Sequence, residues 1–405
     1  MITNCRACGS KELIDILSLG DQYLSDFVKG VEKPGKYPLD LVLCRQCKLL
    51  QLKHSAPVSS LYTDSYGYRS GINQTMRDHL AQLVQKACQL ASPAPGDIVI
   101  DIGCNDGTLL KSYNGSALTK IGFDPVKKFA TYMEGTGIKF INTYFNKPNY
   151  AEYGGEKKAA IITAISMFYD LDDPNTFLSD LKGILAKDGI LVIQQNYLVG
   201  MLLQNAFDNI VHEHREYYSL LSLEKLLDRH GFDVFDVELH DLNGGSFRTY
   251  ICHRGARKIA GPVIKLRESE NKLGLQAKGI YQQFAGRIHE LKDELYGFIA
   301  GEVKQGQTIY VYGASTRGNT LLQYCGLDNT LIAKAVERNR EKWGKKIASV
   351  GIPIISEEQA RREKPDYMLV LPWFFKEEFV KREAAYIEQG GKLLFPLPKM
   401  EIVGK

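Results

Sequence analysis

Carboxylates stand at the ends of two apolar stretches of the sequence. Asp101 lies in the run Ile98–Ile102, and Asp124 directly follows the run Ile121–Phe123. Both runs have the composition of buried strands in a parallel sheet. An acid at the carboxyl end of such a strand typically holds the ribose hydroxyls of a nucleotide. The two residues therefore predict a nucleoside site at one edge of a sheet.

A glycine-containing turn follows the first of these strands and leads into a helix. Such a turn lets the backbone approach a ligand closely. Its spacing is G-x-x-x-G, which is neither the dinucleotide fingerprint nor a Walker loop. A cationic nucleoside that carries an amino acid suits it better than a pyrophosphate; the alternative is a plain turn in some other α/β protein. The residues concerned are Gly103, Asn105 and Gly107.

Two Cys-x-x-Cys pairs lie near the start of the chain. They are formed by Cys5 and Cys8 and by Cys44 and Cys47. Four thiolates in this arrangement are typical of a tetrahedral structural zinc site, which has no open position for catalysis. The alternative is a redox pair or unrelated thiols, and the duplicated spacing disfavours it. His54 could serve as a substitute ligand, but we expect it to be a surface residue.

A histidine cluster, His212-Glu213-His214, follows the predicted strand Ile190–Gln195. Imidazole titrates near neutral pH, and a neighbouring carboxylate can orient it, so a general base is the attractive role. The H-E-x-x-H pattern of zinc enzymes is absent and no third metal ligand is evident in the sequence. A hydrogen-bonded histidine pair in a loop is the alternative.

Tyrosines cluster just before the first predicted helix. They are Tyr62, Tyr66 and Tyr68. Outside a regular element, their hydroxyls could bind a ligand or their rings could join two domains. Both alternatives stay open for Tyr66 and Tyr68, whereas we expect Tyr62 to pack.

The elements that position these residues alternate between strands and helices. A helix is expected over Asn73–Leu90, and the alternation then predicts a doubly wound parallel sheet with ligands at the carboxyl ends of its strands. Further strands are expected at Ala159–Ile165, Ile190–Gln195, Val234–Leu239 and Phe247–Cys252, and helices at Leu109–Tyr113, Val126–Glu134, Pro174–Leu185 and Leu223–His230.

The pattern changes after Gly255. Residues 263–304 are charged and lightly apolar at helical spacing, which predicts one or two connecting helices. A second α/β pattern begins at 308–312, and its glycine turn carries Arg317, which would suit a phosphate. A structural turn is the alternative. Strands are expected at Leu331–Val336, Tyr367–Leu371 and Lys392–Phe395, and a helix at Lys376–Gln389.

Length and composition limit the possible classes of protein. A chain of 405 residues should form two to three domains, and its 44% hydrophobic and 24% charged residues are typical of a globular protein. A net charge of +4 gives no basic face for nucleic acid. With neither a leader nor a long apolar run, we expect a cytoplasmic protein that binds no membrane. We expect a zinc domain over 1–56, an α/β domain over 57–255 with a helical lead-in over 57–95, and a helical connector with a Rossmann-like domain over 256–405.

Several motifs occur in the order found in one enzyme family. The turn and its two acids resemble the S-adenosylmethionine site of class I methyltransferases. Nearly the whole chain resembles the sugar C-methyltransferases. The resemblance rests on the four-cysteine module and on three motifs, D-I-G-C-N-D-G-T-L-L, H-E-H-x-x-Y-x-S and G-A-S-x-x-G-N. That family acts on nucleotide-linked 4-keto-6-deoxysugars in making branched deoxysugars. The resemblance implies a zinc domain, a class I methyltransferase Rossmann-like core, and a C-terminal Rossmann-like domain that helps to hold the sugar nucleotide.

The resemblance also implies roles for single residues. His214 resembles the family's base, with Glu213 beside it and His212 as its neighbour, and Tyr66 or Tyr68 resembles a tyrosine near the transferring methyl group. The expected S-adenosylmethionine contacts are Asp101, Gly103, Asn105, Gly107, Asp124 and Tyr66. The expected contacts to the sugar nucleotide, with dTDP or GDP as its nucleotide, are Tyr197, Gly313, Ser315, Arg317 and Asn319.

Two positions differ from many relatives. Val211 stands where these have tyrosine, and the segment that ends at Asp170 stands where they have an Ala-His pair. Both positions bear on polar contacts to the sugar, so the sugar and the methylated carbon stay open. The protein is expected to be a monomer or a small homo-oligomer.

Other functions fit parts of the sequence. An O- or N-methyltransferase for a small acceptor is the main alternative, but it would need less from a second nucleotide-type domain. An RNA-modifying protein with zinc knuckles is disfavoured by the weak net charge. A reductase with two Rossmann domains would need a G-x-G-x-x-G turn.

Overall fold

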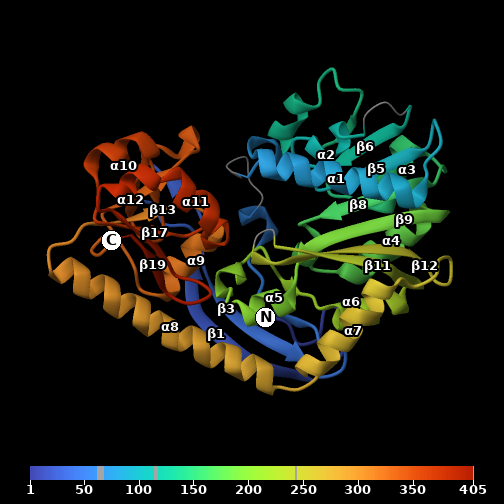
Figure 1. Ribbon diagram of the computed structural model, residues 1–405. Coiled ribbons are helices and arrows are strands. Elements are labelled where there is room, and N and C mark those ends of the chain that lie inside the picture. Colours follow the sequence, from blue (N-terminus) through green and yellow to red (C-terminus); the bar gives the residue numbers. More distant parts are fainter. Residues whose placement is uncertain (62–67, 114–116, 242–243, 405) are drawn as a thin grey trace.

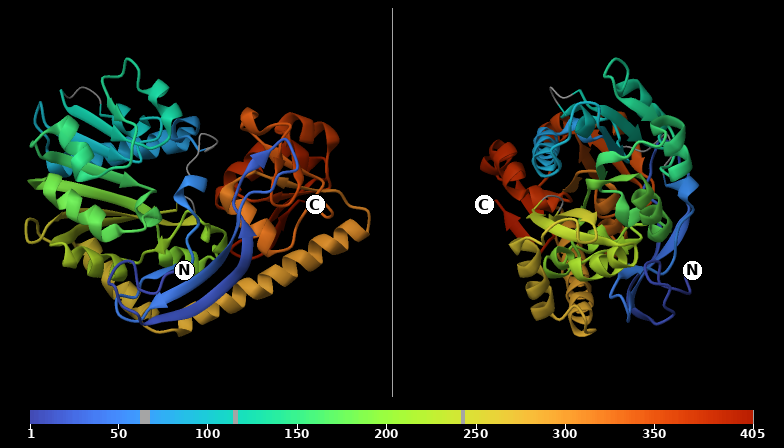
Figure 2. Two further views of the ribbon diagram at one scale, coloured as in Figure 1. Left: turned by 180° about the vertical axis from the view of Figure 1, so that it is seen from behind. Right: turned by 90° about the vertical axis from the view of Figure 1, so that its right-hand side faces the viewer.

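The structure, a computed structural model, describes residues 1–61, 68–113, 117–241 and 244–404 (Figure 1). Two α/β lobes face each other, the first containing β5–β9 and the second containing β13–β18. The hairpin of β1 (Leu13–Tyr23) and β3 (Lys36–Cys44) and the long helix α8 (Gly279–Lys304) both run from one lobe to the other (Figure 2). We call these parts the core lobe, the C-terminal lobe and the hairpin arm.

The core lobe is built on a mixed sheet with the order β11-β12-β9-β8-β5-β6-β7. The strands from β9 to β7 are parallel, and β12 and β11 add an antiparallel hairpin. The chain reverses its direction of winding between β5 and β8, so a ligand is expected above this point. The strands are β5 (Ile98–Ile102), β6 (Thr119–Phe123), β7 (Lys139–Ile141), β8 (Ala159–Ile165), β9 (Leu185–Asn196), β11 (Phe232–His240) and β12 (Ser246–His253).

Helices cover both faces of this sheet because each has one apolar side. Helix α1 (Gln74–Ala91) buries Leu80, Leu83, Val84 and Ala87, which recur at helical spacing. They pack in one cluster with Val99, Ile161 and Val192 of the sheet. The other helical elements of this lobe are α2 (Thr108–Lys111), η3 (Lys127–Tyr132), α3 (Lys147–Gly154), η4 (Phe168–Asp170), α4 (Pro174–Ile184), α5 (Leu198–Leu203), η5 (Phe207–Asn209) and α6 (Leu220–Arg229).

An antiparallel sheet next to the cysteines, which we call the zinc-side sheet, has the order β1-β3-β4-β10. Strands β1 (Leu13–Tyr23), β3 (Lys36–Cys44) and β4 (Leu50–Leu52) come from the start of the chain, whereas β10 (Glu216–Tyr217) comes from the core lobe. Glu216 pairs with Gln51, and Tyr217 pairs with Leu50. The cysteine-bearing part therefore holds the residues that directly follow the His-Glu-His cluster.

The C-terminal lobe contains a second sheet with the order β19-β18-β17-β13-β14-β16-β15-β2. Its parallel part again reverses beside its first strand, between β13 and β17. The strands are β13 (Ile309–Tyr312), β14 (Lys334–Glu337), β15 (Lys346–Ile347), β16 (Ile352–Ser356), β17 (Tyr367–Val370), β18 (Lys392–Phe395) and β19 (Glu401–Val403). The helices of this lobe are α9 (Thr316–Tyr324), α10 (Glu357–Glu363), α11 (Lys376–Arg382) and α12 (Ala384–Glu388). Helix α7 (Gly261–Leu273) precedes α8 and packs against α6 and β11 of the core lobe (Figure 1).

The hairpin arm joins the C-terminal lobe through main-chain contacts. Strand β2 (Phe27–Val28) pairs with β15 at the edge of the second sheet. The Gln323 side chain accepts a hydrogen bond from Tyr23 N at 2.8 Å and donates one to Tyr23 O at 3.1 Å. Neighbouring parts thus share sheets. We propose that the expected limits, between residues 56 and 57 and between residues 255 and 256, separate three modules of the sequence. Because the modules share sheets, we do not expect each of them to fold independently.

Two helix predictions need correction. The segment predicted as a helix over Val126–Glu134 is a 3-10 turn, η3, and its start is fixed because Asp124 accepts a hydrogen bond from Val126 N at 2.9 Å. The helix predicted over Lys376–Gln389 is divided into α11 and α12 at Glu383. Glu383 is 2% exposed and its carboxylate pairs with Arg361, so packing overrides the continuous helical pattern.

None of the helices in the described ranges combines the length and the apolar character needed to cross a membrane.

Candidate active site

The turn after β5 is built around two glycines. Gly103 and Gly107 have φ values of +73° and +72°, a region that favours glycine. A Cβ on Gly103 would lie 3.2 Å from Met167 Cγ, and one on Gly107 would lie 2.5 Å from Met133 Sδ. Neither position can take a larger residue without strain, because the side chains of Met167 and Met133 pack directly against the backbone of this turn.

Asp124 lies at the end of β6 with its carboxylate fixed by the backbone. One oxygen accepts a hydrogen bond from Asn105 N and the other from Val126 N, both at 2.9 Å. A carboxylate offers about four acceptor positions. Two of these stay available for ribose hydroxyls, so the geometry fits the role expected for Asp124.

Asp101 is buried at the end of β5. Thr163 Oγ1 donates a hydrogen bond to Asp101 Oδ1 at 2.6 Å. Burial raises the pKa of Asp101 to about 7, although the Thr163 hydrogen bond opposes the shift, and the nearby Asp124 charge adds to the rise. A cationic group bound beside Asp101 would return it to the ionised form, as expected for the amino-acid part of the cofactor.

The segment that precedes α1 is attached to the cofactor turn. Asn105 accepts a hydrogen bond from Ser70 N at 3.0 Å and donates one to Tyr68 O at 3.2 Å. Gly71 N donates to Asp106 Oδ2 at 3.0 Å, and Arg69 lies 3.3 Å from the same oxygen. Residues 68–71 are therefore held at the cofactor turn, and Asp106 is an anchor that the sequence interpretation missed.

Of the tyrosines in this segment, Tyr68 is half exposed, with 50% of its surface accessible. Tyr62 and Tyr66 lie outside the described residues.

His214 lies in the loop between η5 and β10. Its Nδ1 is 2.9 Å from the backbone oxygen of Asn209, and its ring packs edge-on against Tyr169 with 4.4 Å between centroids. A carbonyl oxygen only accepts hydrogen bonds, so Nδ1 carries the proton and Nε2 carries the free lone pair. Burial and the Arg317 charge lower the pKa of His214 to about 3, so the ring is neutral at physiological pH.

The other two members of the cluster have different surroundings. His212 is buried and its Nε2 donates to the Tyr37 backbone oxygen at 3.1 Å, in the hairpin arm. Burial lowers the pKa of His212. Burial raises the pKa of Glu213 to about 7. His212 therefore uses its Nε2 in a hydrogen bond. Among the hydrogen bonds between described residues, the ring of His214 takes part only through Nδ1.

The four cysteines converge at the end of the zinc-side sheet. Their sulfur atoms all lie within 4.8 Å of one another, with Cys5 to Cys47 and Cys8 to Cys44 at 3.5 Å. Four sulfurs at about 2.3 Å from one zinc ion would be about 3.8 Å apart. The cluster therefore fits a tetrahedral zinc ion after small adjustments.

In the C-terminal lobe, the turn after β13 begins at Gly313, which has φ +95°. Ser315 caps α9 by accepting a hydrogen bond from Gly318 N at 3.1 Å. Asn319 is buried, accepts from the Ser349 hydroxyl, and faces the hairpin arm through Tyr23. The side chains of Ser315 and Asn319 thus already have partners within the protein.

Two other expected substrate contacts are also engaged. Arg317 Nε donates to Asp208 Oδ2 at 2.9 Å, which links the turn to η5 of the core lobe. The Tyr197 hydroxyl donates to Glu270 Oε1 at 2.8 Å, and burial raises the pKa of Tyr197. Glu270 also accepts from Leu220 N and Leu221 N, so it ties α7 to the start of α6.

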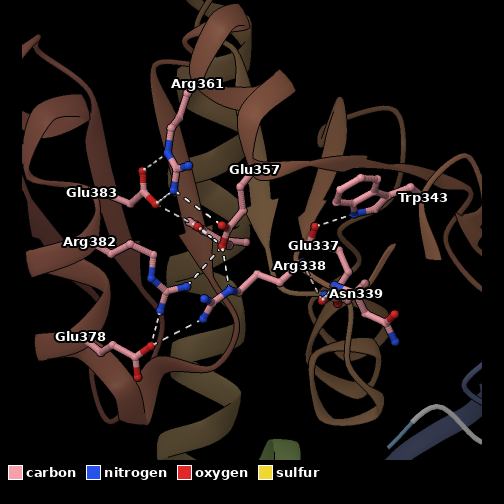
Figure 3. A network of polar contacts seen from close by, with 11 residues as sticks. Glu337, Arg338, Asn339, Trp343, Glu357, Arg361, Glu378, Arg382 and Glu383 are labelled. Atoms are coloured by element: carbon pink, nitrogen blue, oxygen red, sulfur yellow. Dashed lines mark hydrogen bonds and ion pairs between the residues drawn. The ribbon is translucent and has the colours of Figure 1, made fainter. Parts of the chain in front are cut away.

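Figure 3 shows a second charged region of the C-terminal lobe. Arginines and glutamates from the end of β14 and from α10 and α11 alternate there, with contacts such as Arg361 to Glu383 at 2.6 Å and Arg382 to Glu378 at 2.6 Å. Arg338 reaches Glu357 and Glu378. Because the opposite charges offset one another, this region stabilises the lobe and is a poor anion site.

Comparison with known proteins divides the chain into three matched regions. A model of a zinc binding domain matches residues 5–62, a methyltransferase domain matches 69–237, and a C-methyltransferase C-terminal domain matches 241–398. The C-methyltransferase NovU of Streptomyces niveus is 30% identical over 412 residues, which cover 99% of this chain and 97% of NovU. The chain belongs to the C-methyltransferase family. Its three modules therefore form an enzyme that uses S-adenosylmethionine, with structural zinc in the four-cysteine cluster.

This C-methyltransferase also has more distant relatives. The tRNA U34 carboxymethyltransferase of Campylobacter lari is 29% identical over 159 residues, which cover 35% of this chain and 51% of that protein. Among solved structures, the plantazolicin methyltransferase BpumL in complex with a pentazolic desmethylPZN analog and SAH is 13% identical and has a TM-score of 0.37; the match covers 45% of this chain and 86% of that one.

Replacing Asp124 tests the cofactor site of this C-methyltransferase. Asp124→Ala should weaken S-adenosylmethionine binding by about 1.5–3 kcal/mol, the cost of losing hydrogen bonds to a charged group. Calorimetry with the cofactor measures this directly. Asp97→Ala, which removes an acid just before β5, is the control for a general charge effect; equal losses in the two variants would remove Asp124 from the ribose contact.

The raised pKa of Asp101 predicts proton release on cofactor binding. With a pKa of about 7, Asp101 in the free enzyme is mostly protonated below that pH, and a bound cation would ionise it. Affinity should therefore rise with pH up to about 7 and then level off. Calorimetry in buffers of different ionisation enthalpy counts the protons released; Asp101→Asn should abolish the release, and its persistence in that variant would assign it to another group.

Proposed function

We propose that this C-methyltransferase methylates the carbon next to the ketone of a nucleotide-linked 4-keto-6-deoxysugar. The observation that carries this proposal is the environment of His214: a neutral imidazole with Nδ1 tied to a backbone carbonyl and Nε2 free to take a proton. Carbon methylation needs such a base, because the acceptor carbon must first lose a proton. A neutral amine can attack without a base, and a hydroxyl oxygen already has a lone pair before it loses its proton, whereas the carbon has none.

The proposed chemistry uses the acidity of the carbon beside a carbonyl. His214 removes the proton from that carbon at Nε2, and its Nδ1–H stays on Asn209 O. S-adenosylmethionine supplies an electrophilic methyl group on its sulfonium, which the resulting enolate carbon attacks. The core lobe holds the reacting atoms close together, which is worth several kcal/mol of the barrier.

The low pKa of free His214 sets a condition on this mechanism. Burial and Arg317 disfavour the imidazolium that forms when the ring takes a proton. An anionic sugar nucleotide beside the ring would stabilise this cation and raise its pKa. The base therefore becomes effective when the anionic substrate is bound, and it stays neutral and unreactive in the free enzyme.

The C-terminal lobe supplies the proposed nucleotide contact. The turn Gly313–Asn319 lies at the reversal point of the second sheet and opens α9, a position suited to phosphate groups. Arg317 stands on this turn and carries a guanidinium whose Nε and Nη2 face Asp208. We propose that the turn and Arg317 together receive the diphosphate.

Arg317→Ala should weaken the binding of dTDP or GDP about 10- to 100-fold, because a charge-assisted contact is lost. Arg338→Ala is the matched control, since it removes the same charge from the network of Figure 3 in the same lobe. Nucleotide affinity is measured by calorimetry with each diphosphate. Similar affinities in the two variants would take Arg317 out of the site.

The reaction itself is tested with labelled S-adenosylmethionine and a panel of nucleotide-linked keto sugars. The expected product carries the label on carbon, which the carbon NMR shift of a ¹³C-labelled methyl group distinguishes from an O-methyl or N-methyl group. Label on oxygen or nitrogen would favour the alternative class of methyltransferase. Transfer to no member of the panel, with transfer to a small acceptor instead, would refute the sugar-nucleotide proposal.

A further inference from the structure

The 3-10 turn η5 lies between the C-terminal lobe and the histidine proposed as the base. Two of its three side chains face the C-terminal lobe. The Phe207 ring packs against Tyr324 of α9 with 5.2 Å between centroids. Asp208 Oδ2 accepts hydrogen bonds from Arg317 Nε at 2.9 Å and from Trp373 Nε1 at 3.1 Å.

The third residue of η5, Asn209, faces the core lobe. Its side-chain oxygen accepts a hydrogen bond from Asn196 Nδ2, at the end of β9, at 3.1 Å. Its backbone oxygen is the partner of His214 Nδ1 at 2.9 Å. The same short turn thus contacts the C-terminal lobe through one residue and holds the imidazole through the next.

A single 3-10 turn has little structure of its own. Few backbone hydrogen bonds hold η5, among them Asn209 N to Ala206 O at 3.0 Å and Ile210 N to Phe207 O at 2.9 Å. Asp208 is 1% exposed, and a carboxylate buried this deeply must be paired. The position of η5 therefore depends strongly on Arg317 and Trp373, which belong to the C-terminal lobe.

We propose that Asp208 is a positioning residue that couples the docking of the C-terminal lobe to the tautomer of His214. With Asp208 held by Arg317 and Trp373, the Asn209 carbonyl faces the imidazole and keeps the proton on Nδ1. When this contact is weakened, η5 shifts, the Nδ1 hydrogen bond loosens and the Nε2–H tautomer becomes populated. That tautomer has no lone pair at Nε2 and cannot take a proton there. The inference rests on the proposed role of His214.

This coupling gives the C-terminal lobe a part in catalysis beyond holding a ligand. Arg317 stands on the turn proposed to receive the diphosphate and also contacts Asp208. A nucleotide bound at that turn would act on the same contact that places the base. Proton removal is thereby favoured only when the lobe is docked on the core lobe.

Trp373→Phe tests the proposal with a small change, because it removes the indole N–H and keeps an aromatic ring. We expect kcat to fall about 10-fold while KM for the sugar nucleotide and the affinity for S-adenosylmethionine stay unchanged. In nitrogen–proton correlation spectra of histidine-labelled enzyme, the His214 signal, assigned by its loss in His214→Asn, should move from the Nδ1–H toward the Nε2–H pattern. A purely structural role would not change the tautomer.

Trp343→Phe is the matched control. Its indole also donates one hydrogen bond within the C-terminal lobe, to Glu337 O at 2.7 Å, but it does not contact η5. It should leave both kcat and the tautomer unchanged. Asp208→Asn, which keeps the side-chain shape without its charge, should produce a larger shift than Trp373→Phe.

The outcomes separate this inference from the proposed function. An unchanged His214 tautomer in Trp373→Phe and in any folded Asp208→Asn enzyme would overturn the coupling, even if His214→Asn is inactive. Full activity of His214→Asn would instead refute the assignment of His214 as the base. A tautomer shift in Trp373→Phe would then show only that the Asp208 contact positions the His214 ring. A shift together with an inactive His214→Asn supports both.

Discussion

His214→Asn should lower the turnover of methyl transfer by about 10²- to 10⁴-fold, the usual contribution of a positioned general base. Asparagine can still offer an amide N–H near the Nδ1 position, but it has no group at the Nε2 position to accept the proton. The affinity for S-adenosylmethionine should be unchanged, because none of the residues expected to bind it belongs to the loop that carries His214. Single-turnover kinetics and cofactor calorimetry measure the two quantities separately.

Deuterium exchange isolates the proton-removal step from methyl transfer. The proton next to the ketone of the substrate should exchange with deuterated water in the parent enzyme without turnover of the methyl donor. His214→Asn should exchange it far more slowly. The measurement needs only the sugar nucleotide, so a defect in cofactor binding cannot imitate the result.

His212→Asn is the internal control for this experiment. Its Nε2 donates to Tyr37 O in the hairpin arm, so we expect the variant to change packing rather than proton removal. If His214→Asn exchanges the substrate proton as fast as the parent enzyme, the base lies elsewhere. Tyr68 and Tyr66 are then the next candidates; Tyr68 stands on the segment attached to the cofactor turn.

Local patterns predicted the two sheets well, because strands at the centre of a parallel sheet are short, apolar and bounded by turns. β5, β8 and β18 have the predicted limits. β7, with three residues, and β15, with two, are too short to give a periodic signal and were not predicted. The zinc ligands were predictable from spacing alone, since metal geometry requires close pairs.

The contacts around the proposed base were not predictable in the same way. Asn209 and His214 are close in sequence, but Asp208 and Arg317 meet only because α9 docks on η5. Likewise, β10 joins β4 across more than half of the core lobe's sequence. Such contacts depend on how the folded helices and strands pack against one another. A hydrophobic pattern in the sequence does not indicate which residue a buried polar group will contact.

Loss of the zinc ligand Cys44 should strongly destabilise the protein. In free energy, this effect should exceed the effect that the loss of the base has on the rate of methyl transfer. Structural zinc in small modules contributes roughly 10–16 kcal/mol of apparent binding free energy to folding. Cys44 ends β3, and Cys47 lies three residues before the start of β4, whose partner β10 begins two residues after His214. We expect Cys44→Ser to lose the metal, to unfold the zinc-side sheet and to release β10.

Cys44→Ser should also lower the rate of methyl transfer, because the zinc-side sheet holds the residues that follow His214. Without β4, nothing in the zinc-side sheet holds Glu216 and Tyr217, so His214 should lose its position and methyl transfer should fall with it. The core sheet is separate, so cofactor binding should largely remain. Elemental analysis, thermal unfolding and cofactor calorimetry test the three effects. Cys88→Ser, at a half-buried thiol of α1 outside the cluster, is the control and should keep the zinc. A Cys44→Ser enzyme that lacks zinc yet melts and methylates like the parent would show that the metal neither stabilises the module nor places the base.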